Sequence, residues 1–122
     1  MNKVILEGTV VGWPISHTYK YGDLIQFKVS TLSQCVNHKT GQSYLREDKH
    51  NVVCWDHPTR MGNVRRRRLL SAVYLNGGEQ VRVEGKLRTK IQGFETVVSV
   101  EATSIKVKVG RYYRDIQTGR FA

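Results

Sequence analysis

The chain has 122 residues, 39% of them apolar, which suits one domain with a modest core and is too short for two. Its 20 Lys and Arg against 10 Asp and Glu give a formal net charge of +10 with histidine neutral, so a polyanionic partner is expected and nucleic acid is the first candidate. Residues 58–122 carry most of this charge, a net +9 against +1 for residues 1–57.

The first two predicted strands cover about residues 2–12 and 24–34. Gly8 lies inside the first, as Gly85 lies inside a later predicted strand. A glycine in a strand interior is typical of a place where the strand bends sharply around a barrel corner. In the second, apolar residues alternate with polar ones, which is the period of a strand with one buried face. The apolar positions are Ile25, Phe27 and Val29.

A turn is predicted at Lys39-Thr40-Gly41, followed by a third strand over about 44–55 that ends in an apolar run. From about 64 to 75 the apolar residues recur at helical spacing, and Asn76-Gly77-Gly78 supplies a stop. The sequence therefore predicts one helix here. The arginines at 65–68 would point around its circumference, so they cannot all contact one ligand, and they suit a solvated helix start, phosphate contact or docking onto an acidic partner.

A fourth strand is predicted over about 79–91, where Val81, Val83, Gly85 and Leu87 alternate with charged and polar residues. The pair Gln92-Gly93 is short enough for a tight hairpin into a fifth strand over 94–109. The fold class is then all-β with one helix, a five-stranded OB-fold barrel with the helix between the third and fourth strands. Residues 1–109 form this domain, and residues 110–122 form a basic and aromatic C-terminal extension without periodicity.

Several short motifs follow one another in order over residues 2–109. They are Asn2-Lys3-Val4-Ile5-Leu6-x-Gly8 with Pro14 six residues later, Gly22-x4-Phe27-x2-Ser30-Thr31, Thr40-Gly41, His50-x-Val52-Val53, and Gly78-x2-Val81-x-Val83-Glu84-Gly85-x-Leu87-Arg88-Thr89-Lys90. The ordered set resembles the single-stranded DNA-binding protein family of bacteria and mitochondria. This resemblance implies an OB-fold that binds single-stranded DNA in replication, recombination and repair, as a homo-oligomeric dimer or tetramer, with His50 near a subunit interface.

The chain departs from this family at its aromatic residues. The three tryptophans that stack bases in the bacterial proteins are replaced here by Cys35, Lys49 and Gln92. A fourth aromatic position of the family, at the end of the third strand, is filled by Trp55, which is either the best stacking candidate or a core residue. Other rings that could take over stacking are Tyr44, Phe94, Trp13, Tyr19 and Tyr21, and Lys49 is itself a candidate nucleic-acid contact.

The predicted phosphate contacts lie in one row on the fourth strand. Lys86, Arg88 and Lys90 alternate with uncharged residues, and Arg82 continues the row. The alternative is an ordinary solvated strand face. The basic C-terminus stands in place of the family's acidic tail, so we expect no recruitment of partners through such a tail. The short loop at Gln92-Gly93 stands where the family has a long arm, which disfavours the wrapping of long single strands.

Other classes of function find little support. The sequence has no nucleophile motif, Walker-type loop or suggestive acid pair, so we expect no enzyme and no cofactor. Cys35-x2-His38 and Cys54-x2-His57 have the ligand types of a zinc site, but a hairpin about Gly41 would hold the two cysteines far apart, so no metal is expected. With two cysteines, no secretory signal and no membrane span, the expected location is the cytoplasm and nucleoid, or a mitochondrion after loss of a presequence.

Three alternatives to single-stranded DNA binding stay open. The lost tryptophans, the lost acidic tail and the short loop also fit an RNA-binding or scaffold OB-fold similar to subunits of kinetoplastid mitochondrial RNA-editing complexes. The same features fit an accessory protein similar to primosomal replication protein N. A protein-protein adaptor without nucleic acid is the third. Stacking and phosphate contact are common to DNA and RNA, so the sequence does not choose between them.

Overall fold

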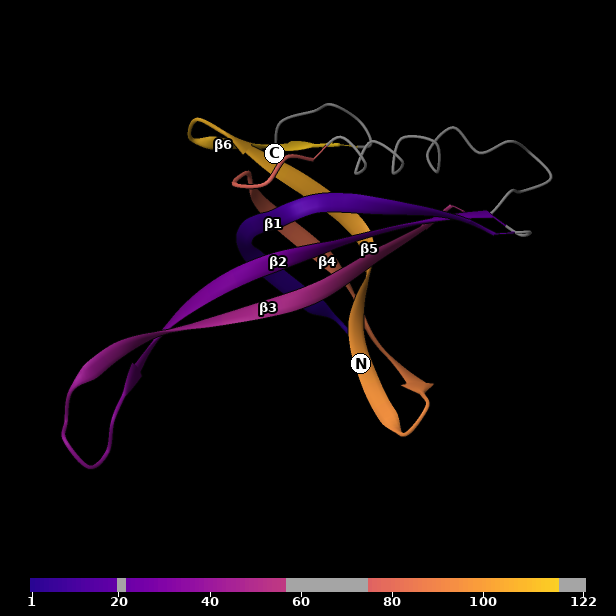
Figure 1. The fold of residues 1–122 in the computed structure, drawn as a ribbon. Coiled ribbons are helices and arrows are strands. Elements are labelled where there is room, and N and C mark those ends of the chain that lie inside the picture. Colours follow the sequence, from indigo (N-terminus) through magenta and orange to yellow (C-terminus); the bar gives the residue numbers. More distant parts are fainter. Residues whose placement is uncertain (20–21, 57–74, 117–122) are drawn as a thin grey trace.

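The structure, a computed structural model, describes residues 1–19, 22–56 and 75–116. Its strands are β1 (Val4–Tyr19), β2 (Gly22–Val36), β3 (Ser43–Asp56), β4 (Gln80–Gln92), β5 (Glu95–Val109) and β6 (Tyr112–Asp115). They follow the sheet order β3-β2-β1-β4-β5-β6, and an additional β3–β5 pairing closes the five long strands into a barrel (Figure 1). The prediction of an all-β, five-stranded closed barrel of the OB type is confirmed.

Strand β1 joins the two halves of the barrel because its two ends pair with different neighbours. Val4–Thr9 pairs antiparallel with β4, and Thr9–Tyr19 pairs antiparallel with β2. On the far side, β3 and β5 run parallel and pair at Val52 with Val100 and at Val53 with Glu101. We call this short contact the closing seam.

The core consists of the inward positions of these strands. The alternation predicted for β2 is confirmed, since Ile25, Phe27 and Val29 are buried while Gln26 and Lys28 are exposed. The remaining buried core residues are Val10, Val52, Cys54, Leu75, Val81, Val83, Val100, Ala102 and Ile105. Leu87 keeps the alternation of β4 but is exposed, and it lies beyond Gly85, where the pairing of β4 with β1 ends.

Gly8 and Gly85 lie where two backbones approach too closely for a side chain. A Cβ on Gly8 would overlap the carbonyl oxygen of Ser30 on β2, and a Cβ on Gly85 would overlap that of Glu101 on β5. The β4–β5 register also shifts between Glu84 and Gly85, which marks a bulge. The predicted role of Gly8 and Gly85 at barrel corners is confirmed.

Strand β1 is longer than predicted. The prediction ended it near residue 12, whereas it continues to Tyr19. The β1–β2 register is interrupted between Val11 and Ile15, and Gly12 takes a φ of 68° inside this interruption. Pro14 therefore lies in a bulge where no ladder hydrogen bond needs its missing N–H, and the strand resumes beyond it.

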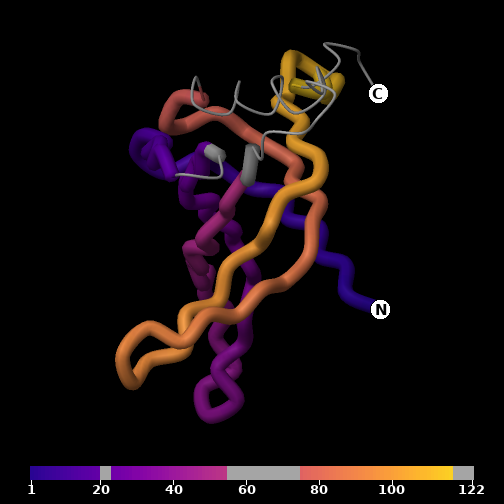
Figure 2. The backbone as a smooth tube through the Cα atoms, turned by 90° about the vertical axis from the view of Figure 1, so that its right-hand side faces the viewer, coloured from indigo at the N-terminus to yellow at the C-terminus, as the bar shows by residue number. Residues whose placement is uncertain are grey.

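Two hairpins project from the same end of the barrel (Figure 2). The β2–β3 hairpin forms a long arm whose loop includes the predicted turn, with the Gly41 N–H donating to the carbonyl of Asn37 at 2.7 Å. The β4–β5 hairpin turns at Gly93-Phe94, one residue later than predicted. Gly93 has a φ of 63° and Phe94 does not have a positive φ, as in a type II′ turn with glycine first.

Two predictions concern segments that lie partly outside the described residues. The helix predicted over 64–75 lies outside the described residues except for Leu75, which packs in the core. Residues 110–122 were expected to lack periodicity, but β6 pairs with β5 from Lys106 to Val109 and extends the sheet by one short strand. Within the described ranges, no helix has the length and apolarity needed to cross a bilayer.

Candidate nucleic-acid interface

A groove crosses the outer face of the barrel between the β1–β2–β3 sheet and the β4–β5 hairpin, with a cavity of about 420 Å³. This central groove is lined by His17, Tyr19, Leu24, Gln26, Asn51, Val53, Arg88, Thr89, Lys90, Gln92, Val97, Ser99 and Glu101. Strand alternation produces the lining, because Val52 and Cys54 on β3 point into the core and so direct Asn51 and Val53 outward.

Two of the predicted cations, Arg88 and Lys90, line the central groove. Arg88 Nε lies 2.8 Å from Glu101 Oε2 on β5, so its charge is partly neutralised before any ligand binds. Lys90 has no ion pair within the described part of the chain. Among the described residues, the groove therefore offers Lys90 as a cation without an ion pair and Arg88 as a cation that an anion would share with Glu101.

The other two cations of the row lie outside the groove. Arg82 is held by acids on its own sheet, with Nε 3.6 Å from Glu7 Oε1 on β1 and 3.9 Å from Glu84 Oε1. Lys86 is exposed, and its Cα lies opposite that of Glu101, but it does not line the cavity. The row predicted from alternation is real along β4, yet the hairpin aims only Arg88 and Lys90 at the β1–β2–β3 face.

Three further predicted residues are spread over the hairpins. Lys49 shares the outer face of β3 with Asn51 but lies beyond the groove, with Nζ 3.8 Å from Glu47 Oε1. Tyr44 lies opposite Cys35 far along the arm, on the other face of β3. Phe94 is fully exposed at the tip of the β4–β5 hairpin.

The predicted stacking role of Trp55 and the predicted interface role of His50 stay predictions. Of Trp55 the structure describes the backbone, which lies in β3 opposite Leu24, a residue of the groove wall. His50 is half-buried, and its Nε2 lies 2.9 Å from Thr31 Oγ1 on β2. The contact to Thr31 orients the His50 ring on the face of β3 away from Asn51.

The groove also contains polar residues that the sequence analysis did not select. Gln26 and Asn51 lie on its floor, and His17 Nε2 lies 3.0 Å from Gln26 Oε1. The His17 and Tyr19 rings are tilted by 39°, with centroids 6.2 Å apart. Tyr19 was one of five possible replacement rings, and among these it lines the groove while Tyr44 and Phe94 do not; Tyr21 lies outside the described residues. Gln26 and Asn51 gave no signal in sequence because they are neither cations nor rings.

The two cysteines lie far apart along the β2–β3 hairpin. Cys35 pairs with Tyr44 near the turn, while Cys54 pairs with Ile25 in the barrel. Burial raises the pKa of the Cys54 thiol to about 12, so it stays a neutral core thiol at physiological pH. Cys54 is thus a small core residue, and His57 lies outside the described residues.

No family model matches the sequence, and no curated protein matches it. Its fold, however, matches solved single-stranded DNA-binding proteins. A Plasmodium falciparum protein of this class, solved in complex with single-stranded DNA, superimposes with a TM-score of 0.71 at 18% identity, over 89% of this chain and 96% of the other. A small single-stranded DNA-binding protein of Streptomyces coelicolor gives a TM-score of 0.62 at 15% identity, over 91% and 97%.

The Thermus aquaticus single-stranded DNA-binding protein gives a TM-score of 0.67 at 21% identity. The match covers 91% of this chain but 52% of the Thermus chain, so the present chain spans about half the length of that protein. The resemblance inferred from the ordered motifs is therefore confirmed at the level of fold.

Proposed function

We propose that the chain binds single-stranded nucleic acid without catalysis, with single-stranded DNA as the preferred ligand. The observation that carries this proposal is the central groove, which sets Arg88 and Lys90 across from Tyr19 and the amides of Gln26 and Asn51. Cations for the backbone, a ring for a base and amides for base edges are the ingredients of single-strand recognition in OB-folds. The net charge of +10 supplies the long-range attraction.

The biological role proposed for this activity is in replication, recombination or repair, with the chain acting as a homodimer or homotetramer. An RNA ligand is the second candidate, and comparison of matched oligo-dT and oligo-U distinguishes the two. Mass measurement of the protein in the same buffer, free and bound, gives the oligomeric state.

Binding of a fluorescently labelled dT oligomer should weaken steeply with salt. Each phosphate neutralised on a single strand releases condensed counterions, so log K should fall against log salt with a slope of about −0.7 per contact, or about −1.4 from Arg88 and Lys90 alone. Fluorescence anisotropy at four salt concentrations measures this slope. A slope near zero would contradict the nucleic-acid proposal and favour a protein-protein adaptor.

Trp55→Ala should lower the affinity for the dT oligomer by about 1 to 3 kcal/mol, because the ring removed is the stacking candidate at the end of β3. The thermal unfolding midpoint should stay near that of the parent protein. If the variant instead unfolds while its folded fraction binds normally, Trp55 is a core residue. Trp55→Phe is the matched control, since it keeps a ring at the same position.

A further inference from the structure

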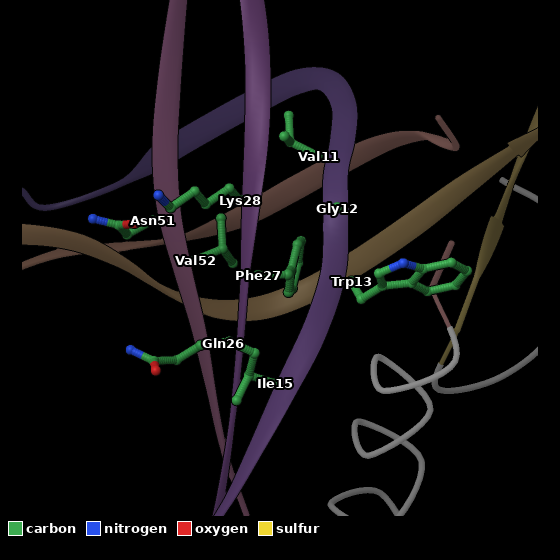
Figure 3. A pocket seen from close by; sticks show the side chains of 9 residues that line it. All are labelled: Val11, Gly12, Trp13, Ile15, Gln26, Phe27, Lys28, Asn51 and Val52. Carbon is green, nitrogen blue, oxygen red and sulfur yellow. The ribbon is translucent and has the colours of Figure 1, made fainter. Parts of the chain in front are cut away.

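A second cavity, of about 260 Å³, lies beside the bulge in β1. Gly12, Trp13 and Pro14 lie between the paired positions Val11 and Ile15, so no β1 residue is paired with Phe27 on β2 at this point. Figure 3 shows Phe27 between β1 and β2 and Trp13 on the outer side of β1. The polar side chains of Gln26, Lys28 and Asn51 lie toward β3. We call this space the bend cavity. Of its lining, the argument uses Trp13, Ile15, Gln26, Phe27, Lys28 and Asn51.

The rim of the bend cavity exposes large apolar side chains. Trp13 is 74% exposed and Ile15 is 58% exposed, while Phe27 beneath them is 4% exposed. Within the described residues, the ring pair that the structure shows is His17 with Tyr19, so no ring stacks on Trp13. Adjacent exposed apolar side chains around a hollow are typical of a binding surface.

The bend cavity continues the central groove. Gln26 and Asn51 line both cavities, so the two hollows meet at this pair of amides. Lys28 lies on the same outer face, with its Cα opposite that of Asn51, and has no ion pair within the described ranges. The outer face thus carries cations in the groove, amides at the junction, and then a cation and a ring at the bend.

This order matches the alternation of charge and flat apolar groups along a nucleic-acid strand. The side-chain oxygen Oε1 of Gln26 accepts a hydrogen bond from His17 Nε2 at 3.0 Å, which leaves the side-chain NH₂ of Gln26 to donate to a base edge. The cavity of about 260 Å³ is below the roughly 300 to 1,000 Å³ of a small-molecule site, so it suits a single flat group more than a larger ligand.

We propose that a bound single strand runs on from the central groove, over Gln26 and Asn51, to the bend cavity, where Trp13 stacks one base and Lys28 contacts a phosphate. This inference rests on the proposed function and extends it. It assigns to Trp13 the stacking role that the replaced residues Cys35, Lys49 and Gln92 do not fill.

The first test is Trp13→Ala, with Ile5→Ala as the matched control, because Ile5 is an exposed apolar residue on the same strand that lines neither cavity. Trp13→Ala should weaken dT binding roughly 5- to 150-fold, the loss of one stacked base, and leave the salt slope unchanged. Trp13→Phe should keep most of the affinity. Lys28→Gln should flatten the slope by about 0.7.

A second measurement does not depend on the folding of Trp13→Ala. The chain has two tryptophans, so Trp55→Phe leaves Trp13 as the sole indole, and its emission should be quenched when dT saturates the protein. Unchanged Trp13 emission together with unchanged dT affinity of Trp13→Ala would overturn the inference. It would also be overturned if Trp13→Ala changed the mass of the assembly without changing its dT affinity, because Trp13 would then contact a second copy of the chain. If the parent protein fails to bind dT at all, the proposed function itself fails.

Discussion

Replacement of Gly85 by alanine should lower the free energy of unfolding by about 3 kcal/mol or more, near the upper end of what a single overpacked side chain costs. The added Cβ would overlap the backbone carbonyl of Glu101 and come within 3.0 Å of the Ala102 Cα. Backbone atoms of a paired strand cannot turn aside as a flexible side chain can. Urea denaturation followed by circular dichroism measures the change.

The matched control is Gly41→Ala in the β2–β3 turn. Gly41 has a φ of +72° with no atom within 4 Å of its added Cβ, so alanine there costs the left-handed conformation alone, about 1 to 2 kcal/mol. A loss for Gly85→Ala no larger than that for Gly41→Ala would contradict the close approach of β4 and β5 as the reason for glycine at position 85.

Removal of both groove cations, by Arg88→Gln with Lys90→Gln, should weaken binding of a dT oligomer on the order of 50-fold at 50 mM salt. Losing two phosphate contacts lowers the salt slope by about 1.4, and this difference accumulates between 50 mM and a reference of about 1 M salt, where the two proteins bind equally. Stability should change little, since exposed substitutions of this kind are usually within about 0.5 kcal/mol. Anisotropy titrations and thermal melts measure the two quantities.

Two single variants locate the effect. Lys86→Gln removes the same charge from the same strand face but outside the groove, so it should have a much smaller effect than the double variant. Glu101→Gln should strengthen binding, because Glu101 holds Arg88 at 2.8 Å and competes with a phosphate for it. If Lys86→Gln weakens binding as much as the double variant does, the strand follows the whole basic face of β4 and not the central groove.

Much of the barrel could be predicted because its signals are local. The alternation around Phe27 marks the buried face of β2 within one segment of sequence. Gly8 and Gly85 likewise mark, by residue type alone, the two places where another backbone comes close. The continuation of β1 past Pro14 could not be predicted in this way. It depends on the register with β2, which leaves the proline in a bulge.

The site was harder to predict because it is made of positions distant in sequence. Arg82 belongs to the same alternating row as Arg88, but the β1–β4 register places Glu7 beside it and removes it from the candidate contacts. Asn51 and Gln26 join two cavities without having any charge or ring to mark them. Pairing partners, and not residue types, decide which cations are available.

The closing seam gives the groove a mechanical consequence. Within the described strands, β3 and β5 pair at two positions, so few backbone pairings hold the barrel closed at the seam. The groove spans the seam, with Asn51 and Val53 on one side and Ser99 and Glu101 on the other. A ligand lying across it would act as a staple, and its contribution to the stability of the closed barrel would grow with its concentration above the dissociation constant.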